Sequence, residues 1–589
     1  MTLSPADWSI IIAYLLLSLG IGLYYKDKAS KSLTDFFLGG RNLPWYIAGT
    51  SMVATTFAAD TPLAVNELVA RNGISGNWLW WNMLLGGMLT TFFFARLWRR
   101  SEILTEVEFI ELRYSGKAAA LLRGFKSLYL GIFMNCLIIG WVNIALQSIL
   151  MVFFGISKEE ALWYVAAAML ITAVYSSISG LWGVAVTDVI QFGIAMAGCI
   201  ILAIIVVNSD RIGGIVGLKS KLPPWSLNFF PDISVAGTRE VSRTLVIGAG
   251  TFLAYVSIWW SSWYPGAEPG GGGYIAQRMM STKNEKHSLF ATLFFQVAHY
   301  CLRPWPWIIV GLCSIVLYPE LGDADKKLGY VMAMREFLPP GLKGLLVVAF
   351  LAAYMSTIST QLNWGSSYVI NDFYKRFIRP ENAFPTPGDA QKNYILASRV
   401  FTILSMLIAL FVTTKIETIS GVWSFIIECG AGLGLVLILR WFWWRINAWS
   451  EITATVAPFG GYAFSKFILH LDFPDSFFVT VGFTTFAWLA VTFLTRPGDE
   501  NKLTAFYEKV RPGGLWPSRI KKNSKEEKSS WKMLLVCWIS SVVMTYSILF
   551  MTGKFIFLEW AEALYWCASA GIMLAVLVFS INKSGIFKN

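Results

Sequence analysis

Long runs of apolar residues separated by short polar segments dominate the sequence. Many runs exceed the length of about 18 residues at which a helix can cross a bilayer. We predict about fifteen membrane-spanning helices from these runs. They begin near residues 8, 43, 77, 124, 159, 183, 244, 288, 342, 395, 417, 449, 475, 532 and 558. The pattern therefore predicts an all-α polytopic membrane protein.

The first run, Trp8 to Tyr25, has no basic residue before it and no small-residue cleavage site after it. A secretory signal peptide carries both features. We therefore interpret this run as a retained membrane span.

Two of the apolar runs are interrupted by residues that break helices. The first, Leu43 to Ala70, contains the segment 58–62 (Ala-Ala-Asp-Thr-Pro) at its centre. The second begins at Thr244 and is interrupted at 264–273, which is rich in glycine and proline. Backbone released from a helix at membrane depth must line a cavity or be buried in protein. The alternative for the second interruption is a simple loop between two separate helices.

The interruptions fall in the first span of each of two five-span blocks, residues 43–207 and 244–445. An odd number of spans inverts the second block relative to the first. Broken helices at matching positions of two inverted halves are typical of transporters with a central site. The predicted divisions are 1–42 (extra span and cytoplasmic loop), 43–207, 208–243 (extracellular loop), 244–445, 446–495 (two further spans), 496–531 (cytoplasmic basic loop) and 532–589 (two spans and tail).

Charge predicts the orientation of the chain. Only 14% of the 589 residues are charged, with a net charge of +12, and 56% are hydrophobic. Lys and Arg gather in alternate loops, which places the N-terminus outside and the C-terminus in the cytoplasm by the positive-inside rule. We predict an integral protein of the plasma membrane, or of the inner membrane in a bacterium. The apolar composition excludes nucleic acid as a partner, and no obligate protein partner is evident.

Four hydroxyl residues lie within five positions of the apolar run 341–369. They are Ser356, Thr357, Ser359 and Thr360. Neutral oxygens at membrane depth suit a weakly bound monovalent cation. The alternative is structural, since Ser and Thr in membrane helices also bond to a carbonyl one turn earlier or let helices pack closely.

Ionisable residues inside apolar runs are further candidates for function. Asp188 either binds an ion or is a helix N-terminal acid favoured by the dipole. Gln296, His299 and Arg303 have i, i+3, i+7 spacing, so they share a face that lines either a hydrated cavity or a structural network. Glu428 is either a site residue or the buried partner of an arginine.

The cysteines and histidines do not indicate a metal, disulfide or haem site. All seven cysteines lie in apolar segments without metal-ligand spacing, so we predict buried thiols and no disulfide. Three scattered histidines are too few for a multi-haem electron carrier. The sequence shows no metal cluster, nucleophile motif or phosphate loop, which argues against an enzyme.

Four stretches together resemble the sodium:solute symporter family, which includes carriers of glucose, proline, sialate and pantothenate. They are residues 35–44, 175–191, 274–284 and 352–363. The resemblance covers about residues 5–495 and implies a LeuT-type fold, a 5+5 inverted repeat, within the fifteen spans. It also implies alternating access, with one or two sodium ions driving a solute inward.

The resemblance also implies site residues. The sodium site shared by the family corresponds here to the carbonyls of Ala54, Phe57 and Ala353 and the hydroxyls of Ser356 and Thr357. A second sodium site, similar to that of the sialate carriers, corresponds to Asp188, Ser356, Ser359 and Thr360. For the solute we predict Thr61, Glu268, Gln296, His299 and Glu428. His299 occupies the position of a substrate-contacting lysine in the sugar carriers.

Some positions depart from the sugar carriers. The second break is longer and richer in glycine, and Thr61 stands where those carriers have Gln or His. Their glutamine on the tenth core helix falls near Ile427, so the sugar site does not transfer as a unit. We predict import of a small polar solute, a sugar or sugar acid. The alternatives are a sodium- or proton-coupled carrier of an amino acid or other carboxylate, and a transporter-like membrane sensor.

Overall fold

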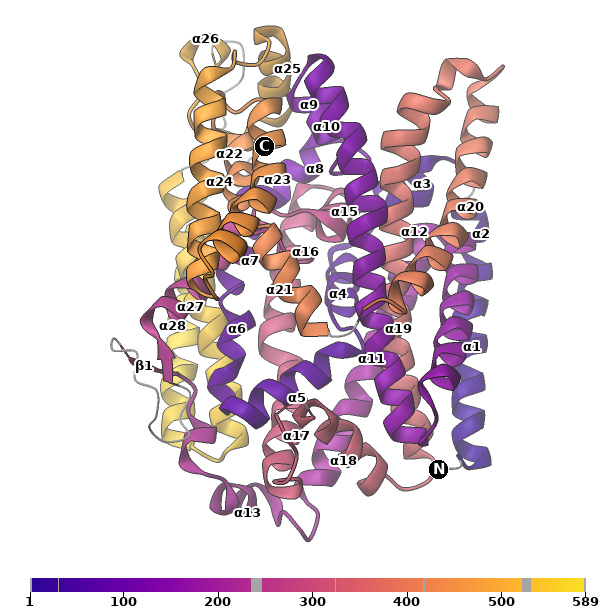
Figure 1. The fold of residues 1–589 in the computed structure, drawn as a ribbon, viewed down its shortest axis with the longest axis vertical. Helices are drawn as coiled ribbons and strands as arrows, with labels where there is room; N and C mark the ends of the chain where they lie inside the picture. Colours follow the sequence, from indigo (N-terminus) through magenta and orange to yellow (C-terminus); the bar gives the residue numbers. More distant parts are fainter. Residues whose placement is uncertain are drawn as a thin grey trace.

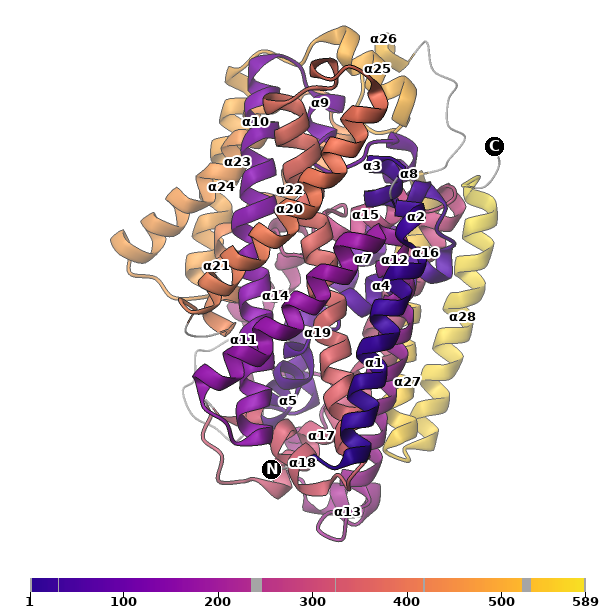
Figure 2. The ribbon, with the colours of Figure 1, turned by 90° about the vertical axis from the view of Figure 1, so that its right-hand side faces the viewer.

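The structure is a computed structural model that describes residues 3–29, 31–234, 246–323, 325–416, 419–521 and 531–586. Parts of the predicted loops 208–243 and 496–531 lie outside these residues. The described chain is almost entirely helical, and most long helices run along the long axis of the molecule (Figures 1 and 2). Its two strands, β1 (Asp232–Ser234) and β2 (Val246–Gly248), form one short parallel pair.

The first predicted repeat follows α1 (Pro5–Tyr24) and three short helices, α2 (Lys26–Ala29), α3 (Leu33–Leu38) and η1 (Gly39–Arg41). Its helices are α4 (Trp45–Thr55), α5 (Asp60–Asn72), η2 (Ile74–Asn77), α6 (Trp78–Trp81), α7 (Leu84–Leu89), η3 (Thr90–Phe94), α8 (Ala95–Ser101), α9 (Phe109–Arg113), α10 (Gly116–Leu128), η4 (Tyr129–Met134), α11 (Asn135–Phe154) and α12 (Lys158–Val207). Gly180, with a φ of 56°, divides α12 into the two predicted spans. Only glycine adopts such a left-handed φ without strain.

The second predicted repeat begins after α13 (Gly214–Lys221) and η5 (Pro224–Leu227). Its helices are α14 (Ala249–Ser261), α15 (Gly273–Ser281), α16 (Glu285–Val297), η6 (Ala298–Leu302), α17 (Pro304–Leu317), η7 (Lys326–Leu328), α18 (Gly329–Phe337), α19 (Leu342–Ser367), η8 (Tyr368–Ile378), η9 (Glu381–Ala383), α20 (Pro387–Thr413), α21 (Ile419–Cys429) and α22 (Gly434–Phe442).

The remaining helices lie outside the two predicted repeats. They are α23 (Ala448–Ala463), η10 (Phe464–Ile468), α24 (Asp475–Leu494), α25 (Glu500–Val510), α26 (Ser518–Lys521), α27 (Trp531–Ile556) and α28 (Trp560–Ser584). Helices α27 and α28 pair with each other along one side of the molecule (Figure 2). Among the described residues, nine helical segments are long and apolar enough to cross a membrane, and Gly180 divides the longest of them, α12. With the two broken helices, the arrangement is the LeuT-type 5+5 inverted repeat that the resemblance implies.

Both predicted helix breaks are present, and the first differs in position. Helix α4 ends at Thr55 and α5 begins at Asp60, so the unwound residues are 56–59 rather than 58–62. Pro62 lies in the first turn of α5, where backbone N–H groups have no helical partner, and proline is therefore tolerated. The second break leaves residues 262–272 between α14 and α15.

The two broken helices lie side by side. The backbone N–H of Leu43, just before α4, donates to the carbonyl of Ser281 at 3.0 Å, and the N–H of Lys283 donates to the carbonyl of Leu43 at 3.1 Å. Helix α4 also packs against α12, α15 and α19. These contacts bring the hydroxyl-rich stretch of α19 to the first break.

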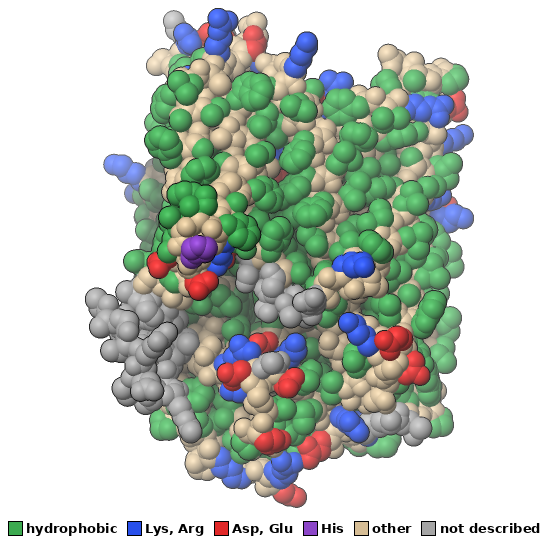
Figure 3. Space-filling view, viewed as in Figure 1, with side chains coloured by type: hydrophobic (Ala, Val, Ile, Leu, Met, Phe, Trp, Pro, Cys, Tyr) green, Lys and Arg blue, Asp and Glu red, His purple; other side chains and the backbone are tan. Residues whose placement is uncertain are grey.

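The surface agrees with a membrane protein. Hydrophobic side chains cover most of the face in Figure 3, Lys and Arg prevail over Asp and Glu at its upper rim, and its lower end carries Asp and Glu mixed with Lys and Arg. Six cysteines are buried as predicted, but Cys567 is exposed. The prediction of a seventh buried thiol is therefore wrong, because Cys567 lies on α28, most of whose surface points away from the protein.

Candidate functional site

Thr357 connects the hydroxyl-rich helix α19 to the first broken helix. Its Oγ1 lies 2.9 Å from the carbonyl oxygen of Thr55, at the end of α4, and 3.2 Å from that of Ala353, one turn earlier in α19. The predicted sodium ligands around it are all buried, with exposed fractions of 1–3% for Ala54, Phe57, Ala353, Ser356 and Thr357. Carbonyl and hydroxyl oxygens therefore converge where α4 unwinds.

Asp188 is the buried carboxylate nearest to these hydroxyls along α12. Ser51 of α4 donates to one of its oxygens at 2.5 Å, and Ser356 of α19 donates to the other at 2.7 Å. The three side chains come from three different helices and are at most 1% exposed. A carboxylate in this position adds negative charge to an otherwise neutral group of hydroxyls.

Arg278 of α15 completes the cluster and was missed as a site residue in the sequence. Its guanidinium lies 3.7 Å from the Asp188 carboxylate and donates to Ser51 at 3.1 Å and to Thr360 at 2.6 Å. Thr360 is in turn 3.0 Å from the hydroxyl of Thr55. The sequence feature that could have identified Arg278 is its position as a lone arginine in the helix that follows the second break.

The structure brings together three of the four residues predicted for a second sodium ion. Asp188 and Ser356 contact each other, and Thr360 contacts the shared partner Arg278. The Ser359 hydroxyl instead donates to the carbonyl of Ser356 at 3.0 Å, which is the structural role that the sequence left open.

A cavity of about 450 Å³ lies beside the first break. Its volume is in the range of small-molecule binding sites. Its polar lining includes the predicted solute residues Thr61, His299 and Glu428, together with Thr55, Asp60, Arg303 and Thr357. Aromatic residues form much of the remaining wall: Trp80, Trp141, Tyr255, Tyr264, Tyr274, Tyr300, Trp423 and Phe473.

Two predicted solute residues, Glu268 and Gln296, do not line this cavity. Glu268 lies within the second break and packs against Gly273. Gln296 packs against Gly87 instead of sharing a face with His299. The physical reason is the π-helical turn η6 at Ala298–Leu302, which changes the rotation along the helix after Gln296.

His299 and Arg303 form a hydrogen-bonded chain with Thr56 of the first break. Arg303 Nη2 lies 3.1 Å from His299 Nε2, and since arginine only donates, Nε2 accepts. The proton of the neutral imidazole is then on Nδ1, which lies 2.9 Å from the hydroxyl of Thr56. That hydroxyl donates to the carbonyl of Val53 at 2.9 Å. The chain fixes the imidazole in a single neutral tautomer.

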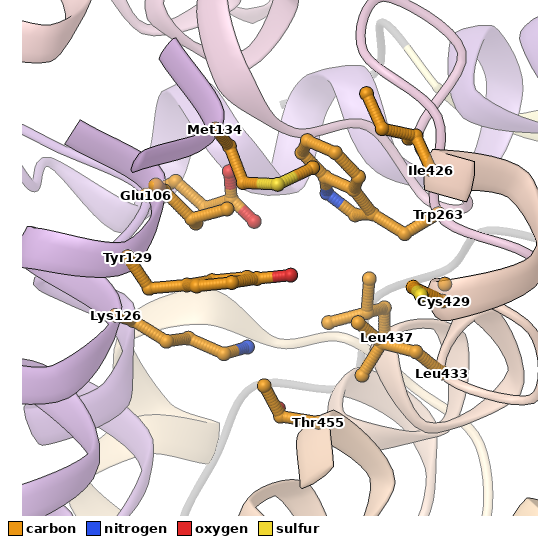
Figure 4. A pocket seen from close by; sticks show the side chains of 12 residues that line it. Glu106, Lys126, Tyr129, Met134, Trp263, Ile426, Cys429, Leu433, Leu437 and Thr455 are labelled. Atoms are coloured by element: carbon orange, nitrogen blue, oxygen red, sulfur yellow. The ribbon is translucent and has the colours of Figure 1, made fainter. Parts of the chain in front are cut away.

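A buried network of ion pairs lies toward the basic end of the molecule. Glu451 of α23 accepts from Lys126 at 2.5 Å and from Arg440 at 2.9 Å. Glu106 accepts from the backbone N–H of Gly273 at 2.6 Å and pairs with Arg440 at 3.4 Å. Figure 4 shows the small space between Glu106, Lys126 and the helices opposite, a cavity of only about 20 Å³. Since that holds little more than one water molecule, the space beside the network is nearly filled.

The two broken helices, the buried cluster of hydroxyls and the central cavity together define a secondary transporter. The family model for the sodium:solute symporter family matches residues 36–455. The chain therefore belongs to the sodium:solute symporter family, whose members are sodium-coupled carriers of small solutes and not enzymes.

Known proteins of this family are distant relatives. The chain is 25% identical over 512 residues to the sodium/glucose cotransporter of Vibrio parahaemolyticus, which covers 82% of this chain and 89% of that protein. It is 26% identical over 447 residues to the high-affinity proline transporter PutP of Bacillus subtilis, with coverage of 74% and 86%. Relatives with different solutes have similar identities to this chain, so they do not determine its solute.

A solved structure shares the fold. A Na⁺-coupled sialic acid symporter in a substrate-bound outward-open state superimposes with a TM-score of 0.67 at 19% identity. The superposition covers 84% of this chain and 99% of that one.

Proposed function

We propose that this protein imports a small polar organic solute, a sugar or sugar acid, by alternating access driven by one or two sodium ions. The observation that carries the proposal is the position of Thr357. Its hydroxyl belongs to the predicted sodium site, and the same residue lines the central cavity. An ion held there and a solute in the cavity would share a wall, which is a direct route for coupling.

The first sodium ion would bind the carbonyls of Ala54, Phe57 and Ala353 and the hydroxyls of Ser356 and Thr357. Such binding would stabilise one arrangement of the first break relative to α19. A ligand shifts a conformational equilibrium only by its difference in affinity for the two states. One charge moving through 100 mV supplies about 2.3 kcal/mol, so the ion can drive accumulation of a solute.

A second sodium ion would use Asp188, Ser356, Ser359 and Thr360. The position of Arg278 supports a connection between this cluster and the second broken helix, because α15 contributes the guanidinium and α12 the carboxylate. An ion binding to Asp188 would compete with Arg278 for the same oxygens. We propose that ion binding displaces Arg278 from Asp188. The movement of Arg278, rather than a direct contact of the ion with α15, would then transmit ion binding to the second repeat.

The basic rim supports the proposed orientation. We propose that the N-terminus is outside and the C-terminus cytoplasmic, in the plasma membrane or a bacterial inner membrane. The ion-pair network of Glu106, Lys126, Arg440 and Glu451 would then form the cytoplasmic barrier. The predicted divisions of the chain, with repeats at 43–207 and 244–445, are retained in this proposal.

Ser356→Ala and Thr357→Ala are each expected to weaken sodium binding about tenfold, or about 1.4 kcal/mol, because each removes one oxygen ligand. Binding of ²²Na⁺ to the purified protein measures this effect. The control is Ser367→Ala in the same helix, whose hydroxyl donates only to the carbonyl of Trp364. Unchanged ²²Na⁺ affinity in both site variants would show that the proposed placement is wrong.

A further inference from the structure

We infer that the transported solute carries a carboxylate and that this group binds the guanidinium of Arg303 in the central cavity. The inference rests on the proposed function, since it takes the cavity to be the solute site. It selects the sugar acid, or another organic acid, over a neutral sugar.

Arg303 is a buried cation that faces the cavity without a counter-ion. Only 2% of the residue is exposed, and its polar contacts are the neutral groups of Thr56 and His299, at 3.2 and 3.1 Å. Its guanidinium also lies 5.4 Å from the centre of the Trp307 ring. Among the described residues no carboxylate lies within ion-pair distance of it. Burying an unpaired charge costs free energy unless a group of opposite charge binds to it.

Other buried arginines of this protein show what a structural arginine looks like here. Arg440, also 2% exposed, pairs with Glu451 and Glu106. Arg123 pairs with Asp372 at 2.6 Å and with Glu111 at 2.6 Å. Arg113, which is completely buried, has no carboxylate within ion-pair distance among the described residues, but it donates to the backbone carbonyls of Arg440, Trp443, Trp444 and Ile446. Arg303 differs from all three in facing the cavity with neither a carboxylate nor a backbone carbonyl as its partner. The difference points to a counter-ion that comes with the ligand.

Arg303 keeps hydrogen-bond donors for such a ligand. Of its five N–H groups, one donates to Thr56 and one to His299. Its Nε has no partner among the described residues. The remaining donors match the two oxygens of a carboxylate, which an arginine binds with two parallel hydrogen bonds. His299 contributes orientation, because its Nε2 accepts one N–H and holds the guanidinium plane.

The two acidic residues that line the cavity, Asp60 and Glu428, are stabilised by groups other than Arg303. Asp60 is the first residue of α5, where the free N–H groups and the helix dipole stabilise a carboxylate. It is near enough to Arg303 for an electrostatic interaction but not for an ion pair. Glu428 accepts from Ser476 of α24 at 3.2 Å. Neither acid neutralises Arg303 directly.

The cavity wall beside Arg303 suits the rest of a small ring-shaped solute. Trp80 stacks on Tyr300 with ring centres 5.5 Å apart, and both rings border His299. Aromatic faces of this kind bind the apolar face of a sugar ring, while Thr61 offers a hydroxyl for its polar edge. A hexuronate, with a carboxylate on a sugar ring, combines both requirements.

The first test measures whether Arg303 lacks a counter-ion. Thermal unfolding of the full-length protein without solute is compared for wild type, Arg303→Met and Arg440→Met. We expect Arg303→Met to unfold at a temperature equal to or above that of wild type, because binding sites trade stability for function. We expect Arg440→Met to unfold at a clearly lower temperature. A comparable loss in both variants would overturn the inference, because Arg303 would then be structural.

The second test uses matched pairs of solutes that differ only in the carboxylate: D-glucuronate with D-glucose, and D-galacturonate with D-galactose. In sodium chloride the acids should raise the unfolding midpoint of wild type more than the hexoses do, and Arg303→Met should abolish that difference. A hexose that stabilises wild type as much as its acid would overturn the inference. The proposed function is tested separately by the unfolding midpoint in sodium chloride without any solute. The comparison of Arg303→Met with Arg440→Met does not depend on sodium, so the two ideas can fail independently.

Discussion

Asp188→Ala is expected to destabilise the protein by about 3–5 kcal/mol, which is the effect of leaving a buried charge unpaired. Asp188 and Arg278 are each completely buried, and Ser51 bridges them. Without the carboxylate, the guanidinium of Arg278 remains in the protein interior with neutral partners. Unfolding in a titration with sodium dodecyl sulfate measures the change in free energy.

The double variant Asp188→Ala/Arg278→Met is the control for this prediction. It removes both charges, so it should be more stable than Asp188→Ala alone, with a coupling energy of about 1–3 kcal/mol. Equal or lower stability of the double variant would contradict the electrostatic explanation and would assign the loss to packing.

Glu451→Ala is expected to have an effect of similar size, about 3–5 kcal/mol, because it leaves two buried cations without their shared carboxylate. Lys126 and Arg440 both donate to Glu451. These contacts join α10, α22 and α23 beside the small cavity. Loss of the network should therefore also increase the labelling of a cysteine introduced at Thr455, which lines the small cavity in Figure 4.

The matched control is Glu500→Ala. Glu500 pairs with Arg519 at 2.9 Å, but both side chains are more than half exposed. Exposed ion pairs contribute about 0–1 kcal/mol, so this variant should unfold almost as wild type does. A large loss in Glu500→Ala, or none in Glu451→Ala, would show that burial does not set the strength of these pairs.

Hydrophobic runs predicted an all-α membrane protein and both helix breaks, because run length and glycine or proline content are local properties of the sequence. The first break was predicted at 58–62, a segment that ends in Pro62, and it lies at 56–59 instead. Proline disrupts a helix only where its N–H would have a partner, and in the first turn of α5 it has none. The exposure of Cys567 depends on which side of α28 meets the protein, which composition does not show.

Part of the candidate site could be predicted from polar residues inside apolar runs, and its role remains a prediction. Asp188, Ser356 and Thr360 could be selected because polar groups there need a reason. Arg278 and Ser51 were missed because their importance arises from contacts between distant helices. Gln296 was placed beside His299 by regular helical spacing, and the π-helical turn η6 invalidates that spacing.

The measurement that tests the central claim most directly is the unfolding midpoint of the purified protein in increasing sodium chloride, compared with potassium chloride at equal ionic strength. A ligand that binds only the folded state raises the midpoint in a concentration-dependent way. We predict a saturable rise in sodium, none in potassium, and a shift of the rise to higher sodium in Thr357→Ala. Identical midpoints in the two salts would contradict a sodium site in this protein and would favour coupling to protons.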